Sequence, residues 1–268
     1  MSDRAPLSEL STHVVSNQAA PFENVNLFDT DRALIGAVAA NGGAEHHDQL
    51  SHFGAECGSA DVQALSRQAN RHVPELRTFD RFGRRLDEVE FHPAYHALMK
   101  LGLDSGISAN AWTQPEAGHV SHGAMMILMG QADPGVTCPM SMTYSSVAAL
   151  ATDRDLADIW VPRVKASSYD SRMIPADEKS GVTIGMAMTE KQGGSDVRAN
   201  TTRAVPDGDG AYLLTGHKWF CSAPMSDAFL TLAYSDDGLT CFLVPRWRPD
   251  GTRNGIHIMR LKDKLGDR

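Results

Sequence analysis

Two segments in the second half of the sequence combine residue types that could hold a ligand. The first, GMAMTEKQGGSDV, covers residues 185–197. In it a short apolar run is followed by a charged pair, two glycines, a serine and an aspartate. Gly193 and Gly194 would let the backbone approach a ligand closely and turn amide hydrogens towards a phosphate, and Ser195 adds a hydroxyl. The segment has neither the Lys of a Walker loop nor the GxGxxG of a dinucleotide fingerprint. A cofactor pocket and an ordinary surface turn therefore both remain open.

The second segment, GHKWFCSAPMSDAFL, covers residues 216–230 and places Ser222 shortly after Trp219. An indole offers a broad apolar face to a flat ring system, and a nearby hydroxyl can donate to or accept from a ring heteroatom. A flavin needs both kinds of contact. The alternative is a tryptophan that fills the core of a β domain beside a turn serine.

Two histidine pairs have spacings that would place both imidazoles on one helix face: His92 with His96, and His119 with His122. Neither pair belongs to an HExxH motif, and no Asp, Glu or Cys stands at an obvious third-ligand position. We therefore predict no metal site and assign these histidines to helix surfaces or helix starts. A set of methionines at helical spacing is predicted to fill the core instead: Met125, Met126 and Met129.

Composition narrows the class of protein. The 268 residues carry 33 acidic and 25 basic side chains, for a net charge of −8. Such a charge repels nucleic-acid phosphates and anionic membranes unless basic groups cluster locally. The four cysteines form no CxxC pair, so we expect a reducing, cytoplasmic setting rather than a disulfide framework. No apolar run is long enough for a membrane span, and we expect a soluble protein.

The hydrophobic pattern changes along the chain. From residue 29 to about residue 162, apolar residues recur at spacings of three and four, which is typical of amphipathic helices. Helix starts are expected at one of Asp29, Thr30 or Asp31, at Ser59 or Asp61, and at Pro93. After Gly181, short β-rich runs are separated by Gly, Pro, Asp or Asn: VTIGMAM, ANTTRAVP, AYLLTGHK, AFLTLAY, LTCFLVP and GIHIMRL. The turn PDGDGAY, residues 206–212, is the clearest hairpin signal.

The sequence thus predicts an α+β, multi-domain chain with a boundary near Ser180. Residues 1–180 would form a helical N-terminal domain, of which residues 1–25 are expected to be mobile. Residues 181–268 would form an antiparallel β domain.

Taken together and in this order, MTEKQGGSDV and HKWFCSA resemble the two flavin-contacting segments in the middle β domain of acyl-CoA dehydrogenases. Three longer blocks are similar to stretches of the alkylation-response branch of that family: VPELRTFDRFGRRLDEVEFHPAYHALM (73–99), IGMAMTEKQGGSDVRANTTRA (184–204) and RLKDKLGDR (260–268). The likeness begins at about residue 20. It implies a helical N-terminal domain, a β-barrel-like middle domain and a second helical domain that hold FAD between them. The implied activity is that of an oxidoreductase acting on the CH–CH bond of an acyl-CoA thioester.

The resemblance also implies which residues bind the flavin. Thr189 would bond the pyrimidine side of the ring, Met188 would lie against it, and Ser222 would lie near its N5 edge. Trp219 and Phe220 would pack on the isoalloxazine. The full implied set is Met186, Met188, Thr189, Gly194, Ser195, Trp219, Phe220, Cys221 and Ser222.

In that family the base that removes the α-proton is a carboxylate of the second helical domain. The sequence ends at Arg268, so we expect that C-terminal domain to be absent from this chain and assign no catalytic base. Glu190, beside Thr189, is expected to be solvated like most loop carboxylates rather than to act as the base. The resemblance further implies a homotetramer for the intact protein, and DNA contact only through the absent domain.

Three functions therefore stay open. The first is an FAD-dependent acyl-CoA dehydrogenase, of which this chain holds the first two domains. The second is a flavoprotein that protects DNA during alkylation stress and has weak or vestigial dehydrogenase activity. The third is an unrelated α+β binding module in which the glycine turn is only structural.

Overall fold

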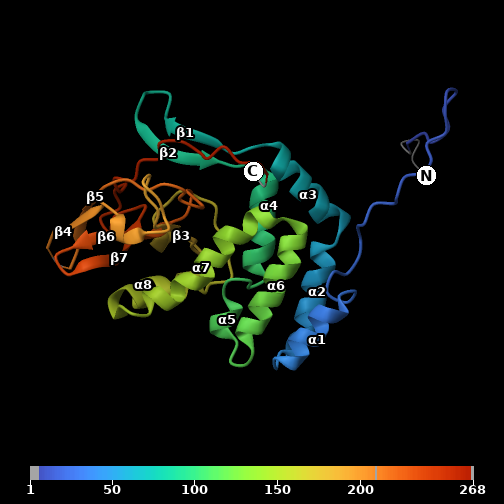
Figure 1. The fold of residues 1–268 in the computed structure, drawn as a ribbon, viewed down its shortest axis with the longest axis horizontal. Helices are drawn as coiled ribbons and strands as arrows, with labels where there is room; N and C mark the ends of the chain where they lie inside the picture. The colour runs from blue at the N-terminus through green and yellow to red at the C-terminus, as the bar shows by residue number, and fades with distance from the viewer. Residues whose placement is uncertain (1–5, 209, 267–268) are drawn as a thin grey trace.

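The chain consists of a helical part packed beside a sheet (Figure 1). A computed structural model describes residues 6–208 and 210–266. The α-helices in these ranges are α1 (Arg32–Ala40), α2 (His47–Cys57), α3 (Ala60–Arg71), α4 (Pro93–Asp104), α5 (Asn110–Thr113), α6 (Gly118–Ala132), α7 (Thr137–Leu150) and α8 (Arg154–Val164). Short 3-10 turns lie at Ala44–His46, Pro134–Val136, Ala176–Glu178 and Val197–Ala199. The helical prediction for this half is thus largely confirmed.

The helix starts follow the capping residues of the sequence. Asp31 caps α1 by accepting a hydrogen bond from the amide of Leu34, and Ser59 caps α3 in the same way. Pro93 occupies the first turn of α4, where its missing amide hydrogen costs nothing. These three predictions are confirmed.

The core of the helical part is formed mainly by α2, α4 and α6. Met125 and Met129 are fully buried there, and Met126 packs against the same cluster. The methionines therefore serve as core residues, as predicted. The other large side chains that are fully buried in this cluster are Phe28, Leu50, Phe53, Leu98, Met99, Ile107, Leu128 and Met140.

A β-hairpin interrupts the helical part and corrects the prediction of helices throughout residues 29–162. Strand β1 (Glu75–Phe79) pairs antiparallel with β2 (Arg85–Glu90). Asp80 closes the turn between them, because its carboxylate accepts hydrogen bonds from the amides of Phe82 and Arg84. The strands are rich in charge and only half-buried. Their alternation is consequently weak beside the strong helical pattern on either side.

The larger sheet contains β3 (Ile184–Ala187), β4 (Arg203–Pro206), β5 (Tyr212–Thr215), β6 (Ala228–Ser235) and β7 (Gly238–Pro245). β6 pairs antiparallel with β7, and β4 pairs antiparallel with β5. β3 and β4, however, both run parallel to β6. The sheet is therefore mixed rather than antiparallel, because a long connection carries the chain from β3 over to β6.

Two further expectations for this half are wrong within the described ranges. The sheet does not close into a barrel there, and the run GIHIMRL forms no strand. The predicted hairpin turn is confirmed, since the amide of Asp207 bonds to the carbonyl of Ala211 at 2.9 Å between β4 and β5. Gly208 and Gly210 adopt φ of 82° and 75°, which favour glycine. Asp209 lies outside the described residues.

The sheet rests on α7 and α8. Trp160 and Val164 of α8 share one buried cluster with Ile184 of β3 and Leu230 of β6. The amide of Ile184 also donates to Oγ1 of Thr143 in α7 at 3.1 Å. This packing fixes β3, and with it the start of the glycine segment, against the helical part. The domain boundary near Ser180 remains a prediction.

The N-terminal stretch precedes these elements. Residues 6–25 contain an isolated bridge between Glu9 and Val14 but no helix or strand, and most of their side chains are exposed. Residues 1–5, which belong to the stretch predicted to be mobile, lie outside the described residues. Among the described helices, none has the length and apolar character needed to cross a membrane.

Candidate cofactor site

The fold brings the two chemistry-bearing segments together. The amide of Trp219 donates to the carbonyl of Thr189 at 2.8 Å, and Met186 forms a bridge with Ser222. The amide of Lys191 donates to Nε2 of His217 at 3.1 Å, which adds a contact between the same segments. The two segments are thus in direct contact, although they lie apart in the sequence.

The glycine segment is shaped by a close approach of its own backbone. β3 ends at Ala187, and the chain then turns back so that Glu190 and Gly193 form a bridge. A Cβ atom on Gly194 would lie 2.5 Å from Oγ1 of Thr189, so any larger residue would displace that side chain. Gly193 has φ of 141°, which favours glycine, and a Cβ there would meet nothing within 4 Å. The backbone is therefore tightly packed at Gly194 and open to space at Gly193.

The second segment has a strained backbone. Phe220 and Ala223 have φ of 56° and 52°, a left-handed conformation that costs a non-glycine residue about 1 kcal/mol or more. The turn holds the ring of Phe220 at the surface, where 60% of the residue is exposed, 5.4 Å from the ring of Trp219. Lys191 and Lys262 lie over the Trp219 and Phe220 rings at 5.8 Å and 5.0 Å. An exposed aromatic surface with nearby cations results.

The predicted residues differ in burial but share this surface. Met186 and Met188 are half-buried and pack against the cluster between the sheet and α8. Burial raises the pKa of the half-buried Cys221 thiol, which Lys218 opposes only in part, so Cys221 contributes a neutral thiol. Thr189 and Trp219 are half-buried, and the exposed members of the set are Gly194, Ser195, Phe220 and Ser222. The two segments thus combine half-buried apolar side chains with exposed hydroxyl groups.

Glu190 corrects the expectation of a solvated loop carboxylate, because it is fully buried. One of its oxygens accepts hydrogen bonds from the amide and hydroxyl of Thr201, at 2.7 and 2.9 Å, and from Nε2 of Gln192 at 2.7 Å. The other accepts from the amide and hydroxyl of Thr202, at 3.0 and 2.5 Å, and from Nζ of Lys218 at 3.0 Å. Six donors therefore surround one carboxylate.

The electrostatics of Glu190 follow from these donors. Burial by itself raises the pKa of a carboxyl group, but the hydrogen bonds from Thr202, Thr201 and Gln192 outweigh burial and hold the pKa of Glu190 well below its usual range. A carboxylate with this low pKa and with its oxygens fully engaged is a poor proton acceptor. This role was not predicted from the sequence; Thr201 and Thr202, which follow Glu190 in the chain, supply four of its six donors but do not by themselves identify it.

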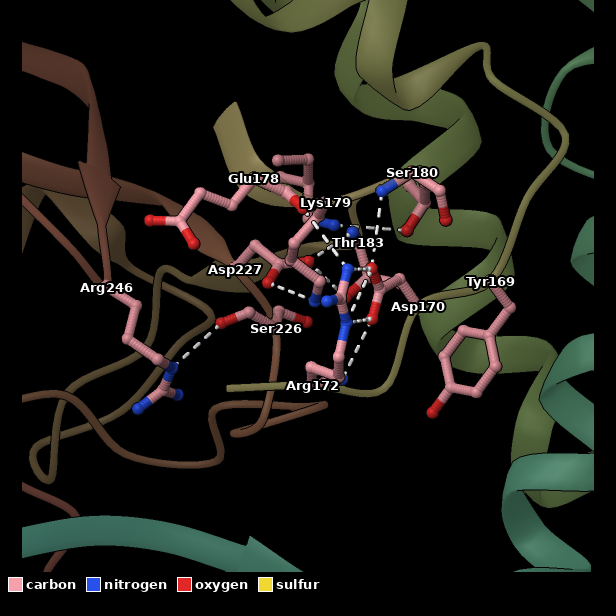
Figure 2. Close-up of polar contacts among 12 residues, drawn as sticks. Tyr169, Asp170, Arg172, Glu178, Lys179, Ser180, Thr183, Ser226, Asp227 and Arg246 are labelled. Atoms are coloured by element: carbon pink, nitrogen blue, oxygen red, sulfur yellow. Dashed lines mark hydrogen bonds and ion pairs between the residues drawn. The ribbon is translucent and has the colours of Figure 1, made fainter. Parts of the chain in front are cut away.

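A second polar network lies at the opposite end of β3 and anchors the connection into the sheet (Figure 2). Nζ of Lys179 pairs with Asp227 at 2.6 Å, and both side chains are almost fully buried. Asp227 also accepts a hydrogen bond from the amide of Thr183 at 2.8 Å. Burial raises the pKa of Asp227 more than Lys179 lowers it, the reverse of the balance at Glu190.

A cavity of about 260 Å³ adjoins this network between β2, α4 and the connection. It is lined by charged and apolar side chains, including Glu88, His96, Tyr169 and Lys179. None of the nine predicted flavin contacts lines it. The cavity and the flavin surface are thus separate features of the fold.

The four histidines weighed as metal ligands have other contacts, and His122 is buried inside α6 rather than on a helix surface as predicted. The ring of His92 accepts from the amide of Ala94 at the start of α4, and His96 bonds to the hydroxyl of Tyr169 at 2.8 Å. His119 bonds to the hydroxyl of Tyr144 at 2.9 Å, and His122 donates to the carbonyl of Ile107 at 2.5 Å. The described ranges contain no cluster of three or more possible metal ligands.

Known proteins share both parts of this arrangement. Residues 17–171 match the family model of the adaptive response protein AidB N-terminal domain. Residues 185–268 match the model of the acyl-CoA dehydrogenase middle domain. This range includes all nine predicted flavin contacts.

Individual relatives agree with the family models. The chain is 45% identical to AidB of Escherichia coli (strain K12) over 96% of its own length and 48% of that protein. It is 32% identical to acyl-CoA dehydrogenase family member 11 of Caenorhabditis elegans over 81% of its length and 37% of that protein. The crystal structure of Caenorhabditis elegans ACDH-11 in complex with C11-CoA superposes with a TM-score of 0.79 at 27% identity, covering 98% of this chain and 47% of the other.

The chain spans less than half the length of each of these relatives. The two family models together account for both halves of the fold described above. The chain belongs to the acyl-CoA dehydrogenase family and carries the N-terminal domain of its AidB branch.

Proposed function

We propose that the protein is an FAD-dependent oxidoreductase of the acyl-CoA dehydrogenase type, and that residues 186–195 and 219–222 form one wall of its flavin site. The observation that carries this proposal is the hydrogen bond from the amide of Trp219 to the carbonyl of Thr189. It joins the two segments whose apolar side chains and hydroxyl groups would form the surface that faces the flavin. A surface of that kind suits a flat ring with polar atoms on its rim.

The residues present fit such a group. Gly194 brings the backbone against Thr189 with no room for a Cβ, while the space above Gly193 is open. Phe220 and Ser222 are exposed and Trp219 is half-buried, and the rings of Trp219 and Phe220 lie 5.4 Å apart. When bound, the flavin would supply the hydride-accepting chemistry that protein side chains lack.

The chain's own residues would position and polarise the cofactor. Thr189 and Ser222 would hydrogen-bond polar atoms of the ring, and Trp219 would exclude water from one face of it. Lys191, over the Trp219 ring, adds positive charge near the wall. Glu190 would not be the base that removes a substrate proton, because it is buried, fully hydrogen-bonded and of low pKa.

An acyl-CoA thioester is the proposed substrate class, supported by the C11-CoA complex of the related ACDH-11. We also propose a cytoplasmic homotetramer. A DNA-protective role is the alternative function. The net charge of −8 on these 268 residues argues against it, because such a charge repels phosphate backbones.

Anaerobic mixing with substrate tests this function. The FAD-loaded protein, at its full natural length, is mixed with straight and branched acyl-CoA esters while the visible flavin absorbance is followed. Bleaching of the flavin by at least one ester is expected. A bound flavin that no ester reduces would contradict the dehydrogenase assignment while leaving the flavin site intact.

A further inference from the structure

Glu190 joins three parts of the chain behind the proposed flavin wall. It belongs to the glycine segment, it receives four hydrogen bonds from residues 201–202, and it is ion-paired with Lys218. We propose that Glu190 is a positioning residue, whose buried carboxylate holds the Thr189 loop and the Trp219 loop in the relative arrangement that binds FAD. This inference rests on the proposed function.

The connectivity around Glu190 supports this role. Lys218, which is paired with Glu190 at 3.0 Å, directly precedes Trp219 in the chain. Glu190 directly follows Thr189, whose carbonyl accepts from the Trp219 amide at 2.8 Å. The ion pair and the main-chain hydrogen bond therefore connect consecutive residues of the same two loops. Loss of the ion pair would therefore disturb the neighbouring hydrogen bond between the Trp219 amide and the Thr189 carbonyl.

The connection also extends to the sheet. The hydroxyl of Thr202 lies 2.5 Å from Glu190 and 3.5 Å from the carbonyl of His217. A Cβ on Gly216 would lie 2.4 Å from that hydroxyl oxygen, so the chain leading into the second segment packs tightly on Thr202. Asn200 completes this contact layer by donating to the carbonyl of Met188 at 2.9 Å.

Only a carboxylate satisfies this environment. All six groups that face Glu190 are donors, and an amide in its place would turn its own N–H group towards at least one of them. Lys218 has a side chain only 9% exposed and would lose its counter-ion in a buried position. Glu190 itself is fully buried, so it cannot touch a ligand, and its effect on the flavin must pass through Thr189 and Trp219.

The test compares Glu190→Gln with a matched control. Asp227→Asn also removes the charge of a buried carboxylate paired with a lysine and hydrogen-bonded to a neighbouring threonine, but at the opposite end of β3. Thr202→Val keeps the Glu190 ion pair and removes one hydrogen bond. If Glu190→Gln does not fold, the comparison is made with Thr202→Val instead. For each variant at full natural length, the FAD dissociation constant, the visible circular dichroism of bound flavin and the thermal midpoint are measured.

Glu190→Gln is expected to raise the FAD dissociation constant by about 10-fold or more, because a displaced wall loses its fit to the ring. Thr202→Val is expected to raise it by about 3-fold, as the loss of one hydrogen bond would. Both should change the visible circular dichroism, which depends on the surroundings of the flavin. Asp227→Asn should lower the thermal midpoint and leave both flavin readouts unchanged.

Two results would overturn the inference and leave the proposed function standing. One is FAD binding and circular dichroism in Glu190→Gln and Thr202→Val equal to those of the unmodified protein. The other is an equal loss of FAD affinity in Asp227→Asn, which would mean that general destabilisation and not positioning is responsible. If the unmodified protein itself fails to bind FAD, the proposed function and this inference are both rejected.

Discussion

Thr189 and Trp219 are joined through their main chains, with the carbonyl oxygen of one 2.8 Å from the amide nitrogen of the other. Such a contact does not depend on the side chains that the two residues carry. The side chains are therefore free to face a ligand while the backbone fixes their separation. Substitutions at 189 and 219 should consequently affect ligand binding more than folding.

Substitution of the wall residues should weaken flavin binding. Trp219→Ala removes the ring that packs on the flavin, and Ser222→Ala removes a hydroxyl beside its rim. Each is expected to weaken FAD binding by about 1 kcal/mol or more, measured by fluorescence titration. Ser235→Ala, at the far end of β6, is the control and should leave FAD affinity unchanged. If all three variants bind FAD as tightly as the unmodified protein, Trp219 and Ser222 do not belong to the site.

Two glycine substitutions should affect different properties, one FAD affinity and the other the stability of the fold. Gly194→Ala introduces a Cβ 2.5 Å from Oγ1 of Thr189 and should lower FAD affinity by displacing that side chain. Gly36→Ala lies in the exposed middle of α1, where a Cβ meets nothing within 4 Å, and should stabilise the fold by about 1 kcal/mol. FAD titration and urea unfolding separate the two effects. Unchanged FAD affinity in Gly194→Ala would show that the glycine segment does not contact the cofactor.

The low pKa of Glu190 has a consequence for acid stability. Because its folded-state pKa lies below the value of 4.5 usual for the unfolded chain, Glu190 stabilises the fold above about pH 4.5. That stabilisation is lost progressively as the pH falls below this value. Glu190→Gln should therefore reduce the free energy of unfolding at pH 7 and make its decline between about pH 4.5 and pH 3 shallower. Urea unfolding at a series of pH values measures both, and an identical acid slope in the variant would contradict the prediction.

Arg246 should stabilise the junction between the hairpin and the sheet. Its buried guanidinium donates to the carbonyls of Ser226 and Asp87, each at 3.2 Å, and to that of Pro224. Arg246→Met would leave these buried acceptors unpaired and should destabilise the protein by about 3 kcal/mol. The matched control is Arg248→Met at an exposed position, which should change stability by less than about 0.5 kcal/mol. Equal effects in urea unfolding would exclude a special role for Arg246.

Much of the fold could be predicted from local signals. Capping by Asp31 and Ser59, Pro93 in a first helical turn and the Asp-Gly turn after β4 depend on residues close in sequence. The hairpin β1–β2 was missed because its few apolar residues give a weak alternation. The parallel pairing of β3 with β6 was missed because pairing depends on the path of the intervening chain, which local propensity does not encode.

The site was predictable only in part for the same reason. The glycine and tryptophan segments carry recognisable residue types, and their likeness to one family placed them together. Glu190 read as a surface carboxylate because the donors that bury it come from residues 192, 201, 202 and 218. Their convergence on one carboxylate is a property of the folded chain and not of any short segment.

The most direct test of the flavin site is the visible absorbance spectrum of the protein, purified at its full natural length, before and after addition of FAD and removal of the excess. We expect a retained flavin with a spectrum shifted from that of free FAD, and loss of that retention in Trp219→Ala. Failure to retain flavin, together with an unshifted spectrum in the presence of added FAD, would contradict the assignment of residues 186–195 and 219–222 to a flavin wall.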